Sequence, residues 1–160
     1  MKYDRFEQLP VWNAAIELAI RVYKLSSDRA FVRQRSLRDQ LERAAVSLSN
    51  NIAEGFERGS TSDLLRFIYI ARGSSGEVRS MLCLLERLSA FSHLKFEISN
   101  LKSSAEEVAR QLRAWATSLQ ESPIKGQRFL NQKSRRFDKA RQDREAMLKE
   151  LREIQEAARQ

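Results

Sequence analysis

The spacing of apolar residues along the first 121 positions predicts four long helices. Apolar side chains recur at alternating three- and four-residue steps, which places them on one face of an α-helix. The four rows, in which Ser75 is the one polar member, are Val11–Ala15–Leu18–Val22–Leu25, Leu37–Leu41–Ala44–Leu48–Ile52, Leu64–Ile68–Ala71–Ser75–Val78–Leu82–Leu85 and Ile98–Leu101–Ala105–Val108–Leu112–Trp115–Leu119. They predict helices over 10–25, 31–56, 62–90 and 95–121. Short connections between such helices favour an all-α, antiparallel up-down-up-down four-helix bundle.

A polar row lies beside the apolar row of the second predicted helix. A solvated face would usually carry lysine and glutamate, but this row consists of Gln40, Arg43, Ser47, Asn51 and Glu54. Small polar groups can be buried when each finds a partner. We therefore expect this helix to face other helices on more than one side and to end at Gly55 or Gly59. The row indicates assembly, and no catalytic chemistry follows from it.

Two glycines lie in the middle of the third predicted helix. Gly73 and Gly76 flank Ser74 and Ser75, and each glycine in a helix interior costs about 1 kcal/mol relative to alanine. We expect the close approach of a neighbouring helix to compensate, because small residues permit such an approach. The alternative is a break into two helices at this point.

The composition changes at 122–126, which predicts a boundary between an oligomerising core, 1–121, and a basic C-terminal helical extension, 122–160. The core contains 18 lysines and arginines and 15 acidic residues, whereas the extension contains 11 and 6, so the shorter segment supplies the larger share of the net charge of +8. An apolar stripe within the extension predicts a charged helix that packs on its own bundle, a sister subunit or a partner protein. The stripe consists of Met147, Leu151, Ile154 and Ala158.

The net charge of +8 and the sequence pI near 10.1 favour a polyanionic partner. Nucleic acid is the first candidate, and an anionic membrane surface is the second. The stretch 125–136 has five basic residues and no acidic one, whereas 143–156 is typical of a solvated helix with paired charges. We predict that nucleic acid, RNA first, is bound by Arg128, Lys133, Arg135, Arg136, Lys139 and Arg141, with Arg33, Arg35 and Arg38 as a second group. Phe129 and Phe137 either stack on unpaired bases or anchor in a protein groove.

Candidate catalytic residues are few. The only histidine, His93, and the only cysteine, Cys83, lie far apart without zinc-ligand spacing. We expect His93 to be exposed or to act as a cap, and Cys83 to be a buried, inert thiol. Two carboxylates, Glu54 and Glu77, suit a metal site, but pairing with arginines is the favoured interpretation. The candidate partners are Arg43, Arg58 or an arginine of another subunit for Glu54, and Arg72 or Arg79 for Glu77. We expect no enzyme, no metal and no cofactor.

The sequence also bears on location. The opening ten residues carry charges where a secretory signal would need an apolar stretch. No segment approaches the roughly 18 apolar residues of a membrane span. We expect a cytoplasmic protein without a membrane partner.

The central stretch resembles a known family. The most specific segments are Arg43-Ala44-Ala45-Val46-Ser47, Asn51-Ile52-Ala53-Glu54-Gly55 and Ala71-Arg72-Gly73-Ser74. They look like the signature of the four-helix-bundle proteins encoded by intervening sequences in bacterial 23S ribosomal RNA genes, and the match covers 6–120. This resemblance implies a bundle that assembles as a homopentameric ring. It also implies structural or subunit-contact roles for Arg43, Ser47, Asn51, Glu54, Gly55, Gly73 and Ser74.

The same resemblance suggests a partner. A relative of the family, the accessory variability determinant of diversity-generating retroelements, is a basic pentamer that binds a reverse transcriptase and its template RNA. Our first hypothesis is a non-catalytic, ring-forming RNA-binding protein, such as the accessory subunit of a reverse-transcriptase ribonucleoprotein. The alternative is a protein–protein scaffold whose C-terminal helix docks a partner through Met147, Leu151 and Ile154. A metal-dependent enzyme using Glu54 and Glu77 is the weakest hypothesis.

Overall fold

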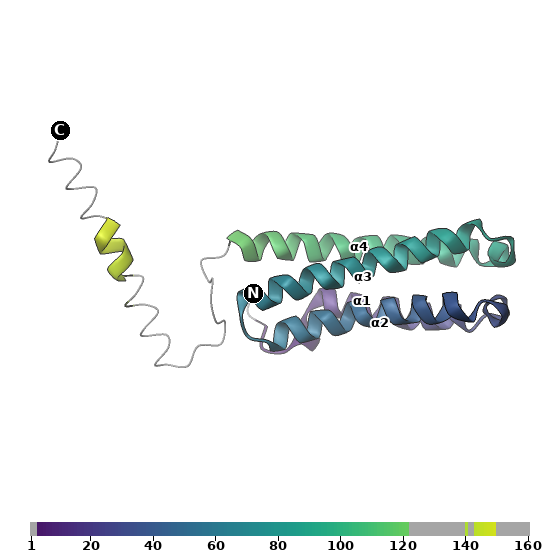
Figure 1. Ribbon diagram of the computed structural model, residues 1–160, viewed down its shortest axis with the longest axis horizontal. Coiled ribbons are helices and arrows are strands. Elements are labelled where there is room, and N and C mark those ends of the chain that lie inside the picture. The colour runs from purple at the N-terminus through teal and green to yellow at the C-terminus, as the bar shows by residue number, and fades with distance from the viewer. Residues whose placement is uncertain (1–2, 122–139, 141–142, 150–160) are drawn as a thin grey trace, which may run out of the picture. The chain divides into compact units, whose positions relative to one another are not determined.

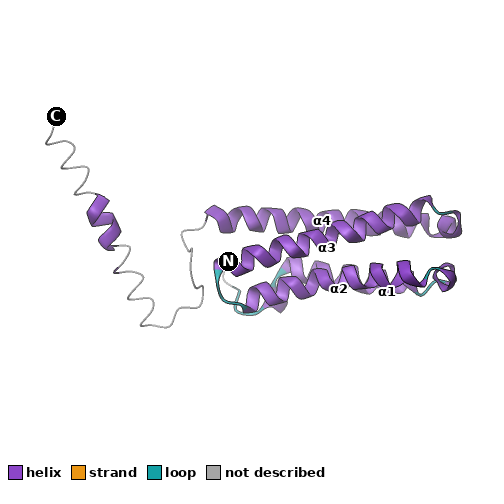
Figure 2. Cartoon of the chain, viewed as in Figure 1, coloured by secondary structure: helices purple, strands orange, loops and turns teal. Residues whose placement is uncertain are grey.

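The computed structural model describes residues 3–121, 140 and 143–149, and its described part is all-helical, as the hydrophobic pattern predicts (Figure 2). The four long helices are α1 (Pro10–Ser26), α2 (Arg35–Glu57), α3 (Thr61–Arg87) and α4 (Lys95–Glu121). Three short 3-10 helices accompany them: η1 (Phe6–Gln8), η2 (Arg29–Arg33) and η3 (Ser89–Leu94). No helix in this described part is long and apolar enough to cross a membrane.

The chain divides into two compact units, Met1–Gly126 and Gln127–Gln160. The first unit holds the four long helices, and in the second unit 143–149 are helical. The predicted boundary between 121 and 122 stays a prediction, because 122–139 lie outside the described residues.

The predicted apolar rows form the core of the first unit. Helix α2 packs against α1 and α3, and α4 packs against α3 and α1. Figure 1 shows the four helices side by side, with the connections between consecutive helices at alternating ends. Within the rows, Leu37, Trp115 and Leu119 are half-buried and the other residues are buried. The periodicity therefore identified the inward faces of all four helices.

Local sequence explains several helix ends. Pro10 begins α1, where the N–H that proline lacks would have had no partner within the helix. Helix α2 ends two residues before Gly59, whose φ of 73° is a backbone conformation that favours glycine. Of the two predicted ends, Gly59 is therefore correct and Gly55 is not. The Ser60 hydroxyl then accepts a hydrogen bond from the backbone N–H of Asp63 (3.1 Å) and caps α3.

The second helix begins later than predicted. Helix α2 starts at Arg35 rather than at Phe31, and the 3-10 helix η2 precedes it. The Asp28 carboxylate caps η2 by accepting a hydrogen bond from the Ala30 N–H (2.8 Å). Phe31 is buried and packs edge to face against Phe91 of η3, with ring centroids 4.8 Å apart. The separate short helix thus places this ring at the end of the core.

The glycines act differently from the prediction. Helix α3 is continuous, so the alternative of a break is wrong. The expected compensation at Gly73 and Gly76 is also wrong within this chain, because both are exposed and an added Cβ at either meets nothing within 4 Å. The close approach occurs at Gly55, where a Cβ would lie 2.6 Å from the Cβ of Phe67 in α3.

Candidate functional site

The middle of the polar row on α2 meets α3 through short hydrogen bonds. The hydroxyls of Ser47 and Ser74 lie 3.0 Å apart. The side-chain amide of Asn51 donates to the carbonyl oxygen (2.7 Å) and to the hydroxyl (3.0 Å) of Ser47. Ser74 is buried, and the other two residues are half-buried. These side chains satisfy one another at the contact between two helices of one chain.

The outer members of the row face solvent. Glu54 pairs with Arg58 one turn later (2.5 Å), which is one of the pairs that the sequence predicts. Arg43 is exposed and forms no ion pair with any described residue. Gly73 of α3 precedes Ser74, which bonds to the row, and is exposed. This surface therefore combines an unpaired cation with a helix face that lacks a side chain.

Three further predictions concern single residues. Glu77 forms no ion pair in the described part of the chain: Arg79 lies near Glu106 of α4 instead (3.7 Å), and Arg72 forms none. Cys83 is half-buried rather than buried. His93 is exposed, as predicted. Among the described residues, histidine, cysteine, aspartate and glutamate form no group of three or more that could hold a metal ion.

Two hollows lie over the polar row. The larger, of about 880 Å³, covers the outer face of α2 next to Tyr23 of α1. Its lining includes four short polar side chains, those of Ser36, Ser47, Asn50 and Asn51. The smaller, of about 320 Å³, lies between the row and two residues of α3, Glu77 and Met81. Short side chains with hydrogen-bonding groups leave room for another polypeptide to approach α2.

The two ends of the first unit differ in charge. We call the two connections and the adjoining helix ends, 24–38 and 86–97, the basic end; Figure 1 shows these connections at one end of the helices. Its acidic residues are Asp28, Glu86 and Glu97, and its cations are Lys24, Arg29, Arg33, Arg35, Arg38, Arg87 and Lys95. The opposite end, 3–12, 54–66 and 112–121, holds six acidic residues and four arginines.

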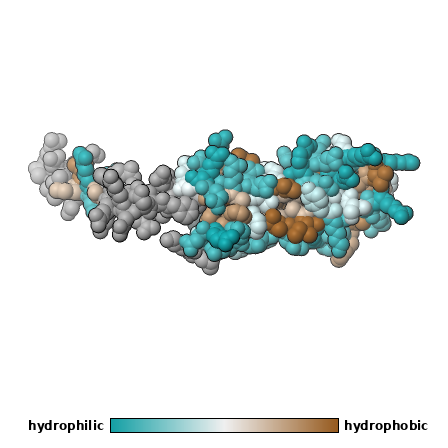
Figure 3. All heavy atoms as spheres, turned by 90° about the horizontal axis from the view of Figure 1, so that it is seen from below, coloured by the Kyte–Doolittle hydropathy of each residue, from teal (hydrophilic) through white to brown (hydrophobic). Residues whose placement is uncertain are grey.

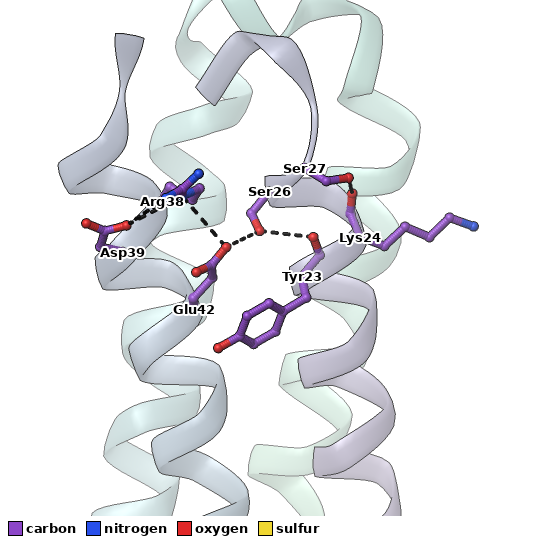
Figure 4. A network of polar contacts seen from close by, with 7 residues as sticks. All are labelled: Tyr23, Lys24, Ser26, Ser27, Arg38, Asp39 and Glu42. Carbon is purple, nitrogen blue, oxygen red and sulfur yellow. Dashed lines mark hydrogen bonds and ion pairs between the residues drawn. The ribbon is translucent and has the colours of Figure 1, made fainter. Parts of the chain in front are cut away.

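Most cations of the basic end are unpaired. Arg38 is the exception, because its guanidinium lies 3.4 Å from the Asp39 carboxylate and 3.9 Å from that of Glu42. The other six cations form no ion pair within the described part. Figure 4 shows that Glu42 also approaches the buried Ser26 hydroxyl, which lies 3.0 Å from the Tyr23 carbonyl oxygen. Arg38 is therefore already engaged, whereas Arg33 and Arg35 are exposed and free of carboxylates.

A groove of about 1070 Å³ opens at the basic end, between the two connections. The positive residues that line it are Arg21, Lys24 and Arg29, the negative ones are Asp28 and Glu97, and His93 lies among them. The Arg21 guanidinium donates to Glu97 (2.9 Å) and to the Ser104 hydroxyl (3.0 Å), which fixes it. Lys24 and Arg29 are exposed and make no ion pair within the described residues.

Asp28 joins the two sides of this groove. Its carboxylate accepts the hydrogen bond from the Ala30 N–H and lies 3.2 Å from Nε2 of His93. The backbone N–H first, and the His93 side chain after it, lower the pKa of Asp28. The ionised carboxylate therefore holds η2 and η3 together.

The residues predicted to bind nucleic acid in the extension lie outside the described residues: Arg128, Lys133, Arg135, Arg136, Lys139 and Arg141. The same is true of Leu151 and Ile154, two members of the predicted docking stripe. Met147 is described and is 62% exposed, and the neighbouring Leu148 is 44% exposed. The stripe therefore has one described member on an exposed helical segment.

Sequence reasoning missed the groove at the basic end. Asp28 and His93 are 65 positions apart, and Phe31 and Phe91 are 60 apart, so no local pattern links them. The available signal was the run of cations that starts with Lys24 in the last turn of the first helix and continues with Arg29 to the predicted arginines.

The fold places this chain in the class of all-helical proteins, with long helices that pack around one core. The model of the family described as 23S rRNA-intervening sequence protein matches residues 7–114. This match covers more than half of the chain, so the chain belongs to that family, and the resemblance of its central stretch is confirmed.

The fold of this chain is similar to that of one solved structure. The chain is similar to a protein of unknown function from the S23 ribosomal protein family of Bacteroides thetaiotaomicron. The TM-score is 0.59, the sequence identity is 21%, and the match covers 66% of this chain and 97% of that chain. At this identity the likeness shows the fold alone. Comparison with curated proteins gave no match.

Proposed function

We propose that this chain is a non-catalytic, homo-oligomeric protein that binds RNA through clustered cations on an antiparallel up-down-up-down bundle and on its basic extension. The observation that carries the proposal is the basic end, where Lys24, Arg29, Arg33 and Arg35 are among six cations that form no ion pair in the described part. Phosphate groups supply the negative charge that such cations lack, and they do so for any sequence.

The proposal extends to the sequence beyond the described residues. The extension adds five net positive charges, as the difference between 11 basic and 6 acidic residues. Arg135 and Arg136 are adjacent in the stretch that has no acidic residue. We propose them as the principal phosphate contacts, with Arg33 and Arg35 as contacts on the bundle.

The contact between subunits is proposed on the outer faces of α2 and α3. Arg43 and Glu77 are exposed, opposite in charge and without an ion pair in the described part, so each suits the other on a second copy. Ile70 (41% exposed) and Leu84 (47% exposed) share the outer face of α3 with Gly73. Figure 3 shows hydrophobic residues in separate patches within a mainly hydrophilic face. Five copies are the number that the resemblance implies.

Light scattering of a Gly73→Trp variant tests that contact. A large ring at an exposed position with open space costs the monomer little, but it blocks the approach of a second helix. The variant should lose the oligomer while it keeps its helical circular dichroism. Ser99→Trp, on the exposed surface of α4, is the matched control and should keep the oligomer. An unchanged mass for Gly73→Trp contradicts this contact surface.

RNA binding is tested by titration at several salt concentrations. Replacing Arg135 and Arg136 with alanine in the full chain should weaken binding to all RNA sequences and reduce the slope of log K against log salt by about 1.4, at roughly 0.7 per phosphate contact on a single strand. Alanine at Arg72 and Arg113, two exposed arginines without an ion pair in the described part, is the matched control. An unchanged slope for the first variant removes that assignment.

A reverse transcriptase is the protein partner that the resemblance implies, and we propose it as the partner to test. Co-purification of a tagged full chain from its own host, with and without ribonuclease, distinguishes a direct protein contact from one bridged by RNA. Recovery of the polymerase after ribonuclease treatment supports the accessory role. Its absence from both samples contradicts that role and leaves RNA binding to be judged by titration.

The second candidate function is a protein–protein scaffold. It is favoured by the exposure of Met147 and Leu148 on the helical segment 143–149, because large exposed apolar residues on a charged helix suit a partner groove. In this case the cations only accelerate association. Aspartate at Leu151 and Ile154 should then abolish partner capture and spare RNA binding. The opposite result favours the RNA-binding function.

A further inference from the structure

We propose that the groove at the basic end binds single-stranded RNA, with phosphate groups on Lys24 and Arg29 and an unstacked base beside His93. This inference rests on the proposed function and names both the form of RNA and its place on the folded bundle.

The cations of the groove divide into one that is held in an ion pair and two that form no ion pair with any described residue. Arg21 is held by Glu97 and Ser104, with distances of 2.9 Å and 3.0 Å. Lys24 and Arg29 line the same groove and are exposed without an ion pair in the described part. A phosphate that binds them breaks no existing ion pair, but the carboxylates of Asp28 and Glu97 line the same groove and oppose part of the attraction.

The rest of the lining suits a base rather than a bare phosphate. Leu25, Ala30, Ala90 and Leu94 line the groove with the cations. The His93 side chain is 55% exposed at the same groove, and an imidazole ring is one of the surfaces on which unpaired bases stack. Bases within a duplex are stacked on one another and cannot enter, so a duplex would contact the cations alone.

The groove is held in shape before any ligand binds. Phe31 and Phe91 pack edge to face at 4.8 Å beneath the two connections, and both rings are buried. The Asp28 carboxylate ties η2 to His93 at 3.2 Å. Because these contacts order both connections, binding a nucleotide costs little further conformational entropy.

The test is fluorescence anisotropy of the full chain with a labelled oligouridylate and with a labelled RNA duplex of the same length. The variant Lys24→Gln with Arg29→Gln should bind the single strand more weakly. The loss of two phosphate contacts reduces the salt slope by about 1.4, so the ratio of Kd values at 200 and 50 mM salt falls about sevenfold. Arg72→Gln with Arg113→Gln removes the same charge elsewhere and should leave the ratio nearly unchanged.

A second pair of variants separates stacking from charge. His93→Ala should weaken single-strand binding at every salt concentration without changing the slope, and His93→Phe should restore it because the ring is retained. Equal loss in the Gln pair and its control, or no loss in either, overturns the groove and leaves the proposed function standing. Equal affinity of the wild type for duplex and single strand overturns the base contact. A full chain that binds no RNA overturns both the groove and the proposed function.

Discussion

Alanine substitution at the three helical glycines adds one methyl group at a time and so measures how closely α2 and α3 pack, as a change in the free energy of unfolding. At Gly55 an added Cβ lies 2.6 Å from the Cβ of Phe67, which belongs to the stem of a side chain and cannot swing away. Ordinary van der Waals contact begins at 3.4 Å, so the helices must part by about 0.8 Å at this crossing. Overpacking of this kind costs about 1–3 kcal/mol.

Gly76 provides the matched control. Alanine at either position gains about 1 kcal/mol in helix propensity, and at Gly76 nothing within 4 Å opposes the new methyl group. The gain cancels when the two variants are compared, so Gly55→Ala should be less stable than Gly76→Ala by the overpacking cost alone. Urea unfolding followed by circular dichroism measures this difference. Equal stability of the two variants would refute the close approach at Gly55.

Gly73→Ala adds a test of assembly to the same series. In one isolated chain it should resemble Gly76→Ala, because its surroundings are equally open. A loss of stability, or a change in oligomer mass, would show that another chain approaches this position.

Two further predictions concern the contacts between the connections. Replacing Phe91 with alanine removes the ring that packs on Phe31 at 4.8 Å and should lower the free energy of unfolding by about 3–5 kcal/mol, measured in urea. Asp28 has a lowered pKa in the folded chain, chiefly because its carboxylate accepts the Ala30 N–H, so the stability it contributes is present above its unfolded pKa of about 3.9 and disappears as the pH falls through the lower folded value. Thermal unfolding of Asp28→Asn between pH 2 and 7 should therefore lose less stability on acidification than the wild type; parallel curves would contradict this coupling.

Periodic patterns were the part of the fold that sequence could predict. Helix α4 spans the predicted residues, 95–121. Its apolar residues, spaced three and four apart, predicted which face is inward. The start of α2 was misplaced because Phe31 belongs to a separate short helix, whose place is set by the packing of its ring on Phe91, 60 positions away. Such long-range contacts leave no local spacing.

The glycines show the same limit. Sequence placed Gly73 and Gly76 inside a helix, but the contact expected at these glycines is made instead by Ser75, which belongs to the inward row of that helix. The Ser75 hydroxyl donates to the carbonyl oxygen of Ala105 in α4 at 2.7 Å. At the candidate sites, charge composition pointed to cations in general. Whether a given cation forms an ion pair depends on the carboxylates near it in the fold, as Asp39 and Glu42 are near Arg38.

The central claim, that an oligomer of this bundle binds RNA through clustered cations, is tested most directly by size-exclusion chromatography with light scattering. The full chain is measured alone and with a structured RNA, at low and at moderate salt. We predict one discrete oligomer that shifts to a larger mass with RNA at low salt and loses that shift as the salt concentration rises. A monomer that ignores RNA at low salt would contradict the account.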